Sequence, residues 1–286
     1  TKFGVRTSAL LSDVDTVRFR HDGIWSTLYT GEVTQESNRQ ISAAGYERKG
    51  DGWSAGAEVG HTLSIVDDND PAQRATLNVF GRYQLSPRLT IMGEQEVTHE
   101  FGSGDAAFPS ETRLQGSMDQ FATTVGAEYR LSDELSITAL ESLRWSGTNS
   151  AQIGLRAQLM EDVDVYTSER FTTGAGRTVS TFIVGAESRA IPGSRSYGEY
   201  QLDHLSSGRN GRAVFGMENA WTVTEGLKLQ LSYERAQLVA STAPVQPSLA
   251  GYSVTTPGVT GAGSGGLSRD QQFSASSYAG GGVFPT

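Results

Sequence analysis

The chain has 286 residues, a formal net charge of −9 and an apolar content of only 37%, and this acidic balance without a basic stripe excludes a nucleic-acid partner. No segment approaches the run of about 18 apolar residues that a membrane-spanning helix needs, so the chain can cross a membrane only as a closed sheet. Cysteine is absent, which excludes disulfides, thiolate metal ligands and a cysteine nucleophile.

The whole chain shows the pattern of many short strands separated by turns. Its 34 glycines, few prolines and widely spread Ser and Thr fit such strands better than helices. We expect about 16 strands, and about 12 to 18 are compatible with the pattern. The expected strands lie near 3–10, 16–20, 24–33, 40–48, 53–65, 74–85, 88–101, 120–131, 135–145, 149–159, 163–173, 178–190, 196–206, 211–222, 227–240 and 270–278.

The clearest strands are 121–131 and 151–159, in which apolar residues alternate with polar or small ones over the full length. A period of two places successive side chains on opposite faces of a sheet. Each of these segments therefore has one apolar face and one polar face.

The expected strands are joined by two kinds of connection. Short polar turns bracketed by apolar residues recur at 85–89, 131–135 and 159–163, and the opposite strand ends carry longer connections such as 102–119. We expect residues 1–286 to form a single domain, in which 241–268 is a long flexible loop containing Gly, Ser and Pro. Short turns at one end and longer loops at the other are typical of up-and-down barrels in outer membranes.

A triplet of glycine, any residue and a charged residue recurs inside the alternation. Its copies lie at 126–128, 154–156, 185–187 and 216–218, and looser copies lie at 45–47 and 56–58. The clear copies are about 30 residues apart, a length that two strands and two connections fill, so the repeating unit is a hairpin. A soluble two-sheet sandwich also alternates, but it usually shows less regular hairpin spacing and a more apolar interior.

In these hairpins, above all at 124–135 and 212–219, the chain resembles porin-like β-barrel proteins of Gram-negative outer membranes. The resemblance covers roughly 40–240 and concerns the style of the hairpins. It implies a transmembrane up-and-down antiparallel β-barrel in the bacterial outer membrane, with the lipid bilayer as its main partner. Such barrels also serve as membrane anchors of larger exported proteins, and a protein partner or an oligomer is left open.

A barrel has a lipid face and a lumenal face, and the alternation assigns residues to each. Trp53 and Trp221 beside short turns and Trp145 beside a longer loop fit the aromatic belts at membrane interfaces. We predict that the lipid-facing residues include Phe121, Val125, Tyr129, Ile153 and Leu155. We predict that the lumen-lining residues include Glu94, Glu96, Glu128, Arg130, Arg156, Glu187, Arg189 and Glu218.

The predicted lumen set has more Glu than Arg, so an open pore is expected to prefer cations modestly. Two carboxylates contradict the simple pattern, because Glu141 and Glu169 are in phase with apolar residues and would face lipid. Three explanations remain: a β-bulge that reverses the phase, an apolar band that ends before these residues, or a partner protein that covers them.

The sequence offers no catalytic constellation, metal site or cofactor site. The chain has four histidines, and its adjacent pairs of a histidine and an acidic residue include His99-Glu100 and Asp203-His204. Adjacent side chains in a strand point to opposite faces, so neither pair forms a catalytic dyad. The acidic loop 67–70 lacks the glycine and the distant Glu of a calcium-binding loop, and no Lys-Ser/Thr pair follows the glycines at 261–266. We therefore expect no enzyme, no metal and no cofactor.

Two functional hypotheses follow. The first is a porin-like channel for small hydrophilic solutes or ions, with the charged face lining the pore. The alternative is a plugged structural barrel that anchors or scaffolds a larger surface assembly, in which the same charges only hold the strands in register.

Overall fold

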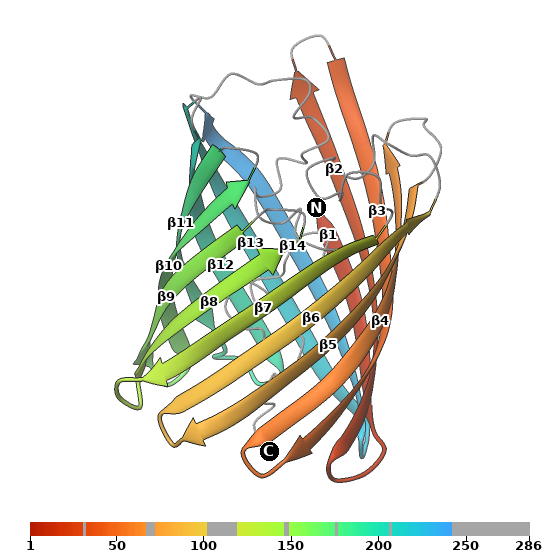
Figure 1. The fold of residues 1–286 in the computed structure, drawn as a ribbon, viewed down its shortest axis with the longest axis vertical. Coiled ribbons are helices and arrows are strands. Elements are labelled where there is room, and N and C mark those ends of the chain that lie inside the picture. Colours follow the sequence, from red (N-terminus) through yellow and green to blue (C-terminus); the bar gives the residue numbers. More distant parts are fainter. Residues whose placement is uncertain are drawn as a thin grey trace.

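A computed structural model describes residues 1–30, 33–66, 72–101, 119–145, 149–174, 177–205 and 208–241. These residues form a closed antiparallel barrel of 14 strands (Figure 1). No helix long and apolar enough to cross a membrane occurs among them. The strands are β1 (Lys2–Leu10), β2 (Asp15–Thr30), β3 (Val33–Gly50), β4 (Trp53–Val66), β5 (Ala72–Ser86), β6 (Leu89–Phe101), β7 (Asp119–Arg130), β8 (Leu135–Arg144), β9 (Asn149–Met160), β10 (Val163–Gly174), β11 (Arg177–Ser188), β12 (Ser194–Leu205), β13 (Gly208–Thr224) and β14 (Leu227–Ser241).

Every strand pairs with its neighbours in sequence, and β1 pairs with β14 to close the barrel. Connections of two to five residues join β1 to β2, β3 to β4 and each later odd strand to the next at one end, here called the short-turn end. The opposite end is called the long-loop end. Gly52 and Gly226 have φ angles of 71° and 83° in two-residue turns, a conformation that favours glycine over residues with a Cβ.

The predicted fold class is confirmed, and the expected strand number was approximate. The segments expected at 16–20 and 24–33 belong to one continuous strand, β2, which pairs without interruption with β3. Residues 21–23, expected to separate two strands, are extended because they pair with β1 on one side and with β3 on the other. The strand expected at 270–278 lies outside the described residues, as does nearly all of the loop expected at 241–268.

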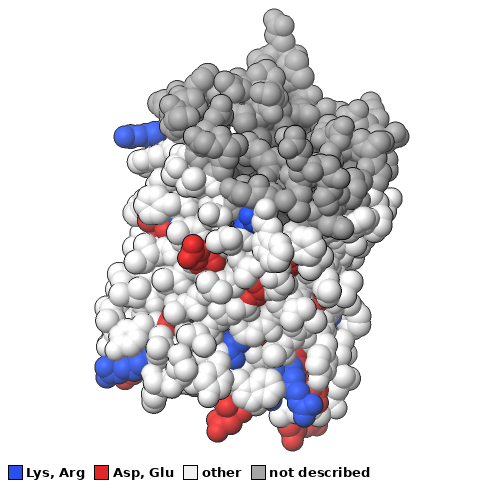
Figure 2. All heavy atoms as spheres, viewed as in Figure 1, with Lys and Arg blue, Asp and Glu red and all other residues white. Residues whose placement is uncertain are grey.

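The exterior of the barrel is apolar and the interior is polar. Large apolar side chains on the outer face, such as Val125 at 54% exposure, are uncovered along the wall. Trp53 and Trp221 are exposed at the short-turn end and Trp145 at the long-loop end. Charged residues are sparse on the wall seen in Figure 2 and gather toward the short-turn end. Such a wall suits hydrocarbon and not water, and the closed sheet excludes the sandwich alternative.

Glu141 faces outward, as its phase in the sequence indicates. The register of β8 with β7 and β9 is unbroken, so no bulge reverses the phase there. Val125 is directly opposite Glu141, and Leu143 and Trp145 continue the exposed apolar surface beyond it. For Glu141, the explanations by a bulge and by an early end of the apolar band are therefore wrong, and a covering partner remains a prediction. Glu169 accepts a hydrogen bond from the Ser180 hydroxyl, and its explanation stays open.

The two faces predict different costs for an added charge. Val125→Arg places a cation on the lipid face and should lower the free energy of unfolding by about 2–4 kcal/mol. Thr124→Arg places it in the lumen, where Thr124 donates a hydrogen bond to Ser142, and should cost much less. Urea unfolding from lipid vesicles measures both. Equal losses would show that the faces are assigned wrongly.

Removal of the outward carboxylate gives the complementary prediction. Glu141→Leu should raise the free energy of unfolding of the isolated barrel in lipid vesicles by about 1–2 kcal/mol, because a carboxylate no longer has to be placed against hydrocarbon. Glu128→Leu, which changes a lumenal carboxylate on the neighbouring strand, is the matched control and should not stabilise the barrel. A loss of stability in Glu141→Leu would mean that the carboxylate is needed where it lies.

Candidate functional site: the charged lumen

Six of the residues predicted to line the lumen point inward from the strands: Glu94, Glu96, Glu128, Arg156, Glu187 and Glu218. Glu96, Glu187 and Glu218 are buried, and Glu94, Glu128 and Arg156 are partly exposed. Arg130 and Arg189 are exposed near the short-turn end. The five residues predicted to contact lipid lie on the outer face, where the ring of Phe121 packs against that of Trp145 at 5.3 Å between centroids.

The glycine-x-charged repeat builds a charged belt inside the barrel. In every odd-numbered strand, one charged side chain points inward near the short-turn end, two residues after a glycine or, in β5, after Phe80. We define the charged belt as Arg6, Glu47, Arg82, Glu128, Arg156, Glu187 and Glu218. The charge alternates in sign from strand to strand except between Glu187 and Glu218.

Belt residues form ion pairs across an intervening strand. The N···O distance is 3.1 Å between Arg82 and Glu128 and 3.2 Å between Arg156 and Glu187. Arg6 and Glu218 form a third such pair, at 3.8 Å, across β14. Inward side chains converge on a circle smaller than the wall itself, so long Arg and Glu side chains span two strand spacings.

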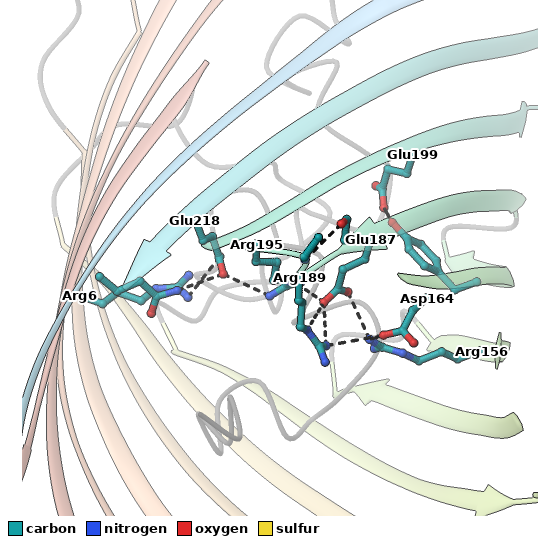
Figure 3. A network of polar contacts seen from close by, with 12 residues as sticks. Arg6, Arg156, Asp164, Glu187, Arg189, Arg195, Glu199 and Glu218 are labelled. Carbon is teal, nitrogen blue, oxygen red and sulfur yellow. Dashed lines mark hydrogen bonds and ion pairs between the residues drawn. The ribbon is translucent and has the colours of Figure 1, made fainter. Parts of the chain in front are cut away.

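The centre of the best-connected part of the belt is Glu187, whose side chain is only 1% exposed. Arg156, Arg189 and Arg195 all approach its carboxylate (Figure 3). Arg195 of β12 also reaches Glu218 at 3.2 Å, and so it bridges the two acidic belt residues that follow one another. Three guanidinium groups and two carboxylates thus share one network, in which each buried charge has a partner.

The glycines of the repeat make room for large side chains from the neighbouring strand. A Cβ at Gly185 would lie 2.3 Å from the Tyr166 hydroxyl oxygen, and one at Gly216 would lie 2.1 Å from the Tyr197 ring. Both rings therefore lie across the inner wall. The Tyr166 hydroxyl donates to Glu199 at 2.9 Å, and the Tyr197 hydroxyl donates to Glu234.

The charge balance expected from the sequence is wrong. The inward basic residues of the strands include Lys2, Arg6, Arg18, Arg20, Arg39, Arg74, Arg82, Arg144, Arg156, Arg170, Arg195, Arg212 and Lys228. The inward acidic residues include Asp22, Glu47, Glu58, Glu94, Glu96, Glu128, Asp164, Glu187, Glu199, Asp203, Glu218 and Glu234. The two sets nearly balance, so the basis for a cation preference is lost.

Most of the missed lumenal residues are arginines in strands whose phase was less clear. The alternation Val17-Arg18-Phe19-Arg20 in β2 does carry the signal, since Phe19 is exposed outside and both arginines point inward. Their partners are far away in sequence, as in the pairs Arg18–Glu47 and Arg20–Glu58. Only the strand register brings such residues together.

The histidines lie outside this network. All four are on the outer face, where the Nδ1 atom of His21 contacts the Ser42 hydroxyl and His61 contacts Gln73. His204 points outward, whereas its neighbour Asp203 points inward to Thr181 and Arg212. Among the described residues, no group of three or more His, Asp or Glu is arranged to hold a metal ion.

A closed barrel with an apolar exterior and a charged interior defines a transmembrane β-barrel of the outer-membrane type. No protein-family model and no curated protein matches the chain.

Solved structures with a similar fold include the KdgM porin, at 8% identity over 82% of this chain and 98% of that chain, with a TM-score of 0.43. The deltaS2 mutant of the monoaromatic hydrocarbon channel TodX is 11% identical over 82% and 88%, with a TM-score of 0.47. The COG4313 outer membrane channel from Pseudomonas putida F1 is 10% identical over 82% and 95%, with a TM-score of 0.43. At these identities, none of them indicates a solute for this chain.

The belt predicts unequal costs for neutralising its acids. Glu187→Gln leaves three guanidinium groups without their shared carboxylate in a buried site and should lower the free energy of unfolding by about 2–4 kcal/mol. Glu128→Gln changes a carboxylate that is 25% exposed and should cost about 1 kcal/mol or less. Urea unfolding of both variants in the same lipid vesicles measures the two losses. A cost for Glu128→Gln as large as that for Glu187→Gln would contradict the role of burial.

Proposed function

We propose that the protein is a passive porin-like channel of the bacterial outer membrane that passes small hydrophilic solutes or ions. The observation that supports this most directly is the partial exposure of the belt. The side chains of Arg82 and Arg156 remain 30% and 32% exposed although they point into the barrel. Water therefore reaches the charged wall of the lumen.

The pairing of the belt charges suits passage better than tight retention. Arg82 with Glu128 and Arg156 with Glu187 offset each other, so a passing ion meets polar groups of both signs and no deep electrostatic well. A wall of this kind replaces part of the hydration shell of a small solute and releases it again.

We assign no catalytic role to the described residues. The histidines face outward, away from the lumenal carboxylates, so no base is placed beside an acid and a nucleophile. The lipid bilayer is the partner that the apolar wall requires, and Glu141 remains the place where a protein partner or a second copy would be sought.

Single-channel recording in planar bilayers tests the proposed function. Purified protein that shows heat-modifiable mobility, and is therefore folded, should give reproducible conductance steps in KCl solution. The control is the same protein unfolded by heat before it is added, which should give none. Absence of conductance from the folded barrel would remove the channel and leave the structural barrel.

A further inference from the structure

One lumenal carboxylate forms no ion pair with the described residues. Most inward acids are paired with an arginine or a lysine, as Glu58 in β4 is with Arg20 at 3.0 Å. Within the described part of the chain, the carboxylate of Glu94 in β6 accepts a single side-chain hydrogen bond, from the neutral amide of Asn78 in β5. Glu94 is therefore a negative charge without a neutralising partner on these strands.

The residues directly opposite Glu94 carry no charge and leave its lumenal side open. They are Phe80 in β5 and Thr124 in β7, and Thr124 donates its hydroxyl to Ser142. A Cβ at Gly56 of β4 would lie 2.6 Å from the Phe80 ring, so this ring leans toward β4 and away from β6. Glu94 itself is partly exposed, and a solute in the lumen can reach its carboxylate.

The other charged groups that influence Glu94 are acids. Glu96 and Glu58 act on its carboxylate, and both have the same sign as Glu94. Arg144 and Arg74 act on Glu96, which lies one inward position further along β6, but neither is among the groups that act on Glu94. The local potential at Glu94 is therefore negative.

The inward cation that flanks this position on β5 is engaged elsewhere. Arg82 is two residues from Phe80 and pairs with Glu128 at 3.1 Å. Through Thr90, Glu128 is in register with Gln84, which lies beyond Arg82 toward the short-turn end. The Arg82 side chain therefore extends away from Glu94, which lies on the long-loop side of it.

The amide of Asn78 adds a second unsatisfied acceptor beside this carboxylate. Asn78 is only 2% exposed, and its Nδ2 atom donates to the Oε1 atom of Glu94 at 2.8 Å. The Oδ1 atom of the same amide is buried and accepts no hydrogen bond from the described residues. Acceptors thus outnumber donors at this point of the inner wall.

We propose that Glu94 and Asn78 form a binding site for the protonated amino group of a small solute. An ammonium group supplies the three N–H donors and the positive charge that this pair of side chains lacks. A partly desolvated carboxylate gains most from a cation that also donates hydrogen bonds. The proposal rests on the channel proposed above and names a class of solute that this channel would hold briefly.

A metal ion suits the site less well than an ammonium group. Hard cations take several oxygen ligands, and in the described part of the chain no group of three or more His, Asp or Glu is arranged to hold one. An ammonium group needs only one carboxylate and neighbouring acceptors. The probe is therefore an amine.

Binding is measured on folded barrel in detergent, because this readout does not depend on an open pore. Ethanolamine is titrated in KCl solution and followed by the ¹H line width of its methylene groups, at neutral and at mildly alkaline pH. Ethylene glycol, which is similar in size but uncharged, is the control solute. Wild-type protein should broaden the lines of ethanolamine and not those of ethylene glycol. Equal behaviour of the two solutes at both pH values would overturn the proposal.

Variants locate the site. Glu94→Gln keeps the shape of the side chain and should weaken binding of ethanolamine by about tenfold or more, since charge-assisted hydrogen bonds are lost. Glu94→Asp keeps the carboxylate and should retain part of the binding. Glu234→Gln is the matched control, because Glu234 is a partly exposed lumenal carboxylate that is opposite Lys2, and this variant should bind like wild type. Broadening that survives Glu94→Gln would place the amine elsewhere and overturn the proposal.

Arg82→Gln separates a solute from an internal occupant. If this variant binds ethanolamine and wild-type protein does not, Arg82 fills the site itself and the proposal is wrong.

Recording in planar bilayers separates the site from the channel. Ethanolamine should lower the KCl conductance of the wild type more than that of Glu94→Gln. Binding in detergent without any conductance would remove the proposed channel and keep the amine site. Conductance without binding would keep the channel and overturn the site, so the two failures are distinguishable.

Discussion

The structure depends on the convergence of inward side chains in a closed sheet. Closure leaves no free sheet edge among the described strands, as a bilayer requires, and it makes the inner circumference smaller than the outer one. Side chains on alternate strands therefore approach one another across the strand between them. The pairs Arg82–Glu128 and Arg156–Glu187 are the direct result.

The same convergence explains the structural role of the hairpin repeat. Each repeat supplies one inward charge near the short-turn end, and where neighbouring repeats carry opposite signs the two charges can pair, as Arg82 does with Glu128 and Arg156 with Glu187. The glycine two residues before that charge leaves room for an aromatic ring of the neighbouring strand, such as Tyr166 or Tyr197. One short sequence pattern thus builds both the electrostatic and the packing layer of the inner wall.

The pairing within the charged belt limits the net charge at that level of the lumen. Arg82 with Glu128 and Arg156 with Glu187 offset each other, so a solute near the belt would meet groups of both signs. On the outside, Glu141 departs from the apolar pattern of the wall, since it faces outward directly opposite Val125.

The sequence by itself determined the fold class, the hairpin as repeating unit and the position of residues such as Val125 and Glu128, because a strand has a fixed period of two. It placed a break between the strands expected at 16–20 and 24–33, where pairing on both sides keeps β2 continuous. It also missed the balance of lumenal charge, since many inward arginines stand in strands with a weaker pattern. Only the tertiary structure decided which charges meet, because Arg6 and Glu218, at opposite ends of the barrel sheet, become neighbours through closure and register alone.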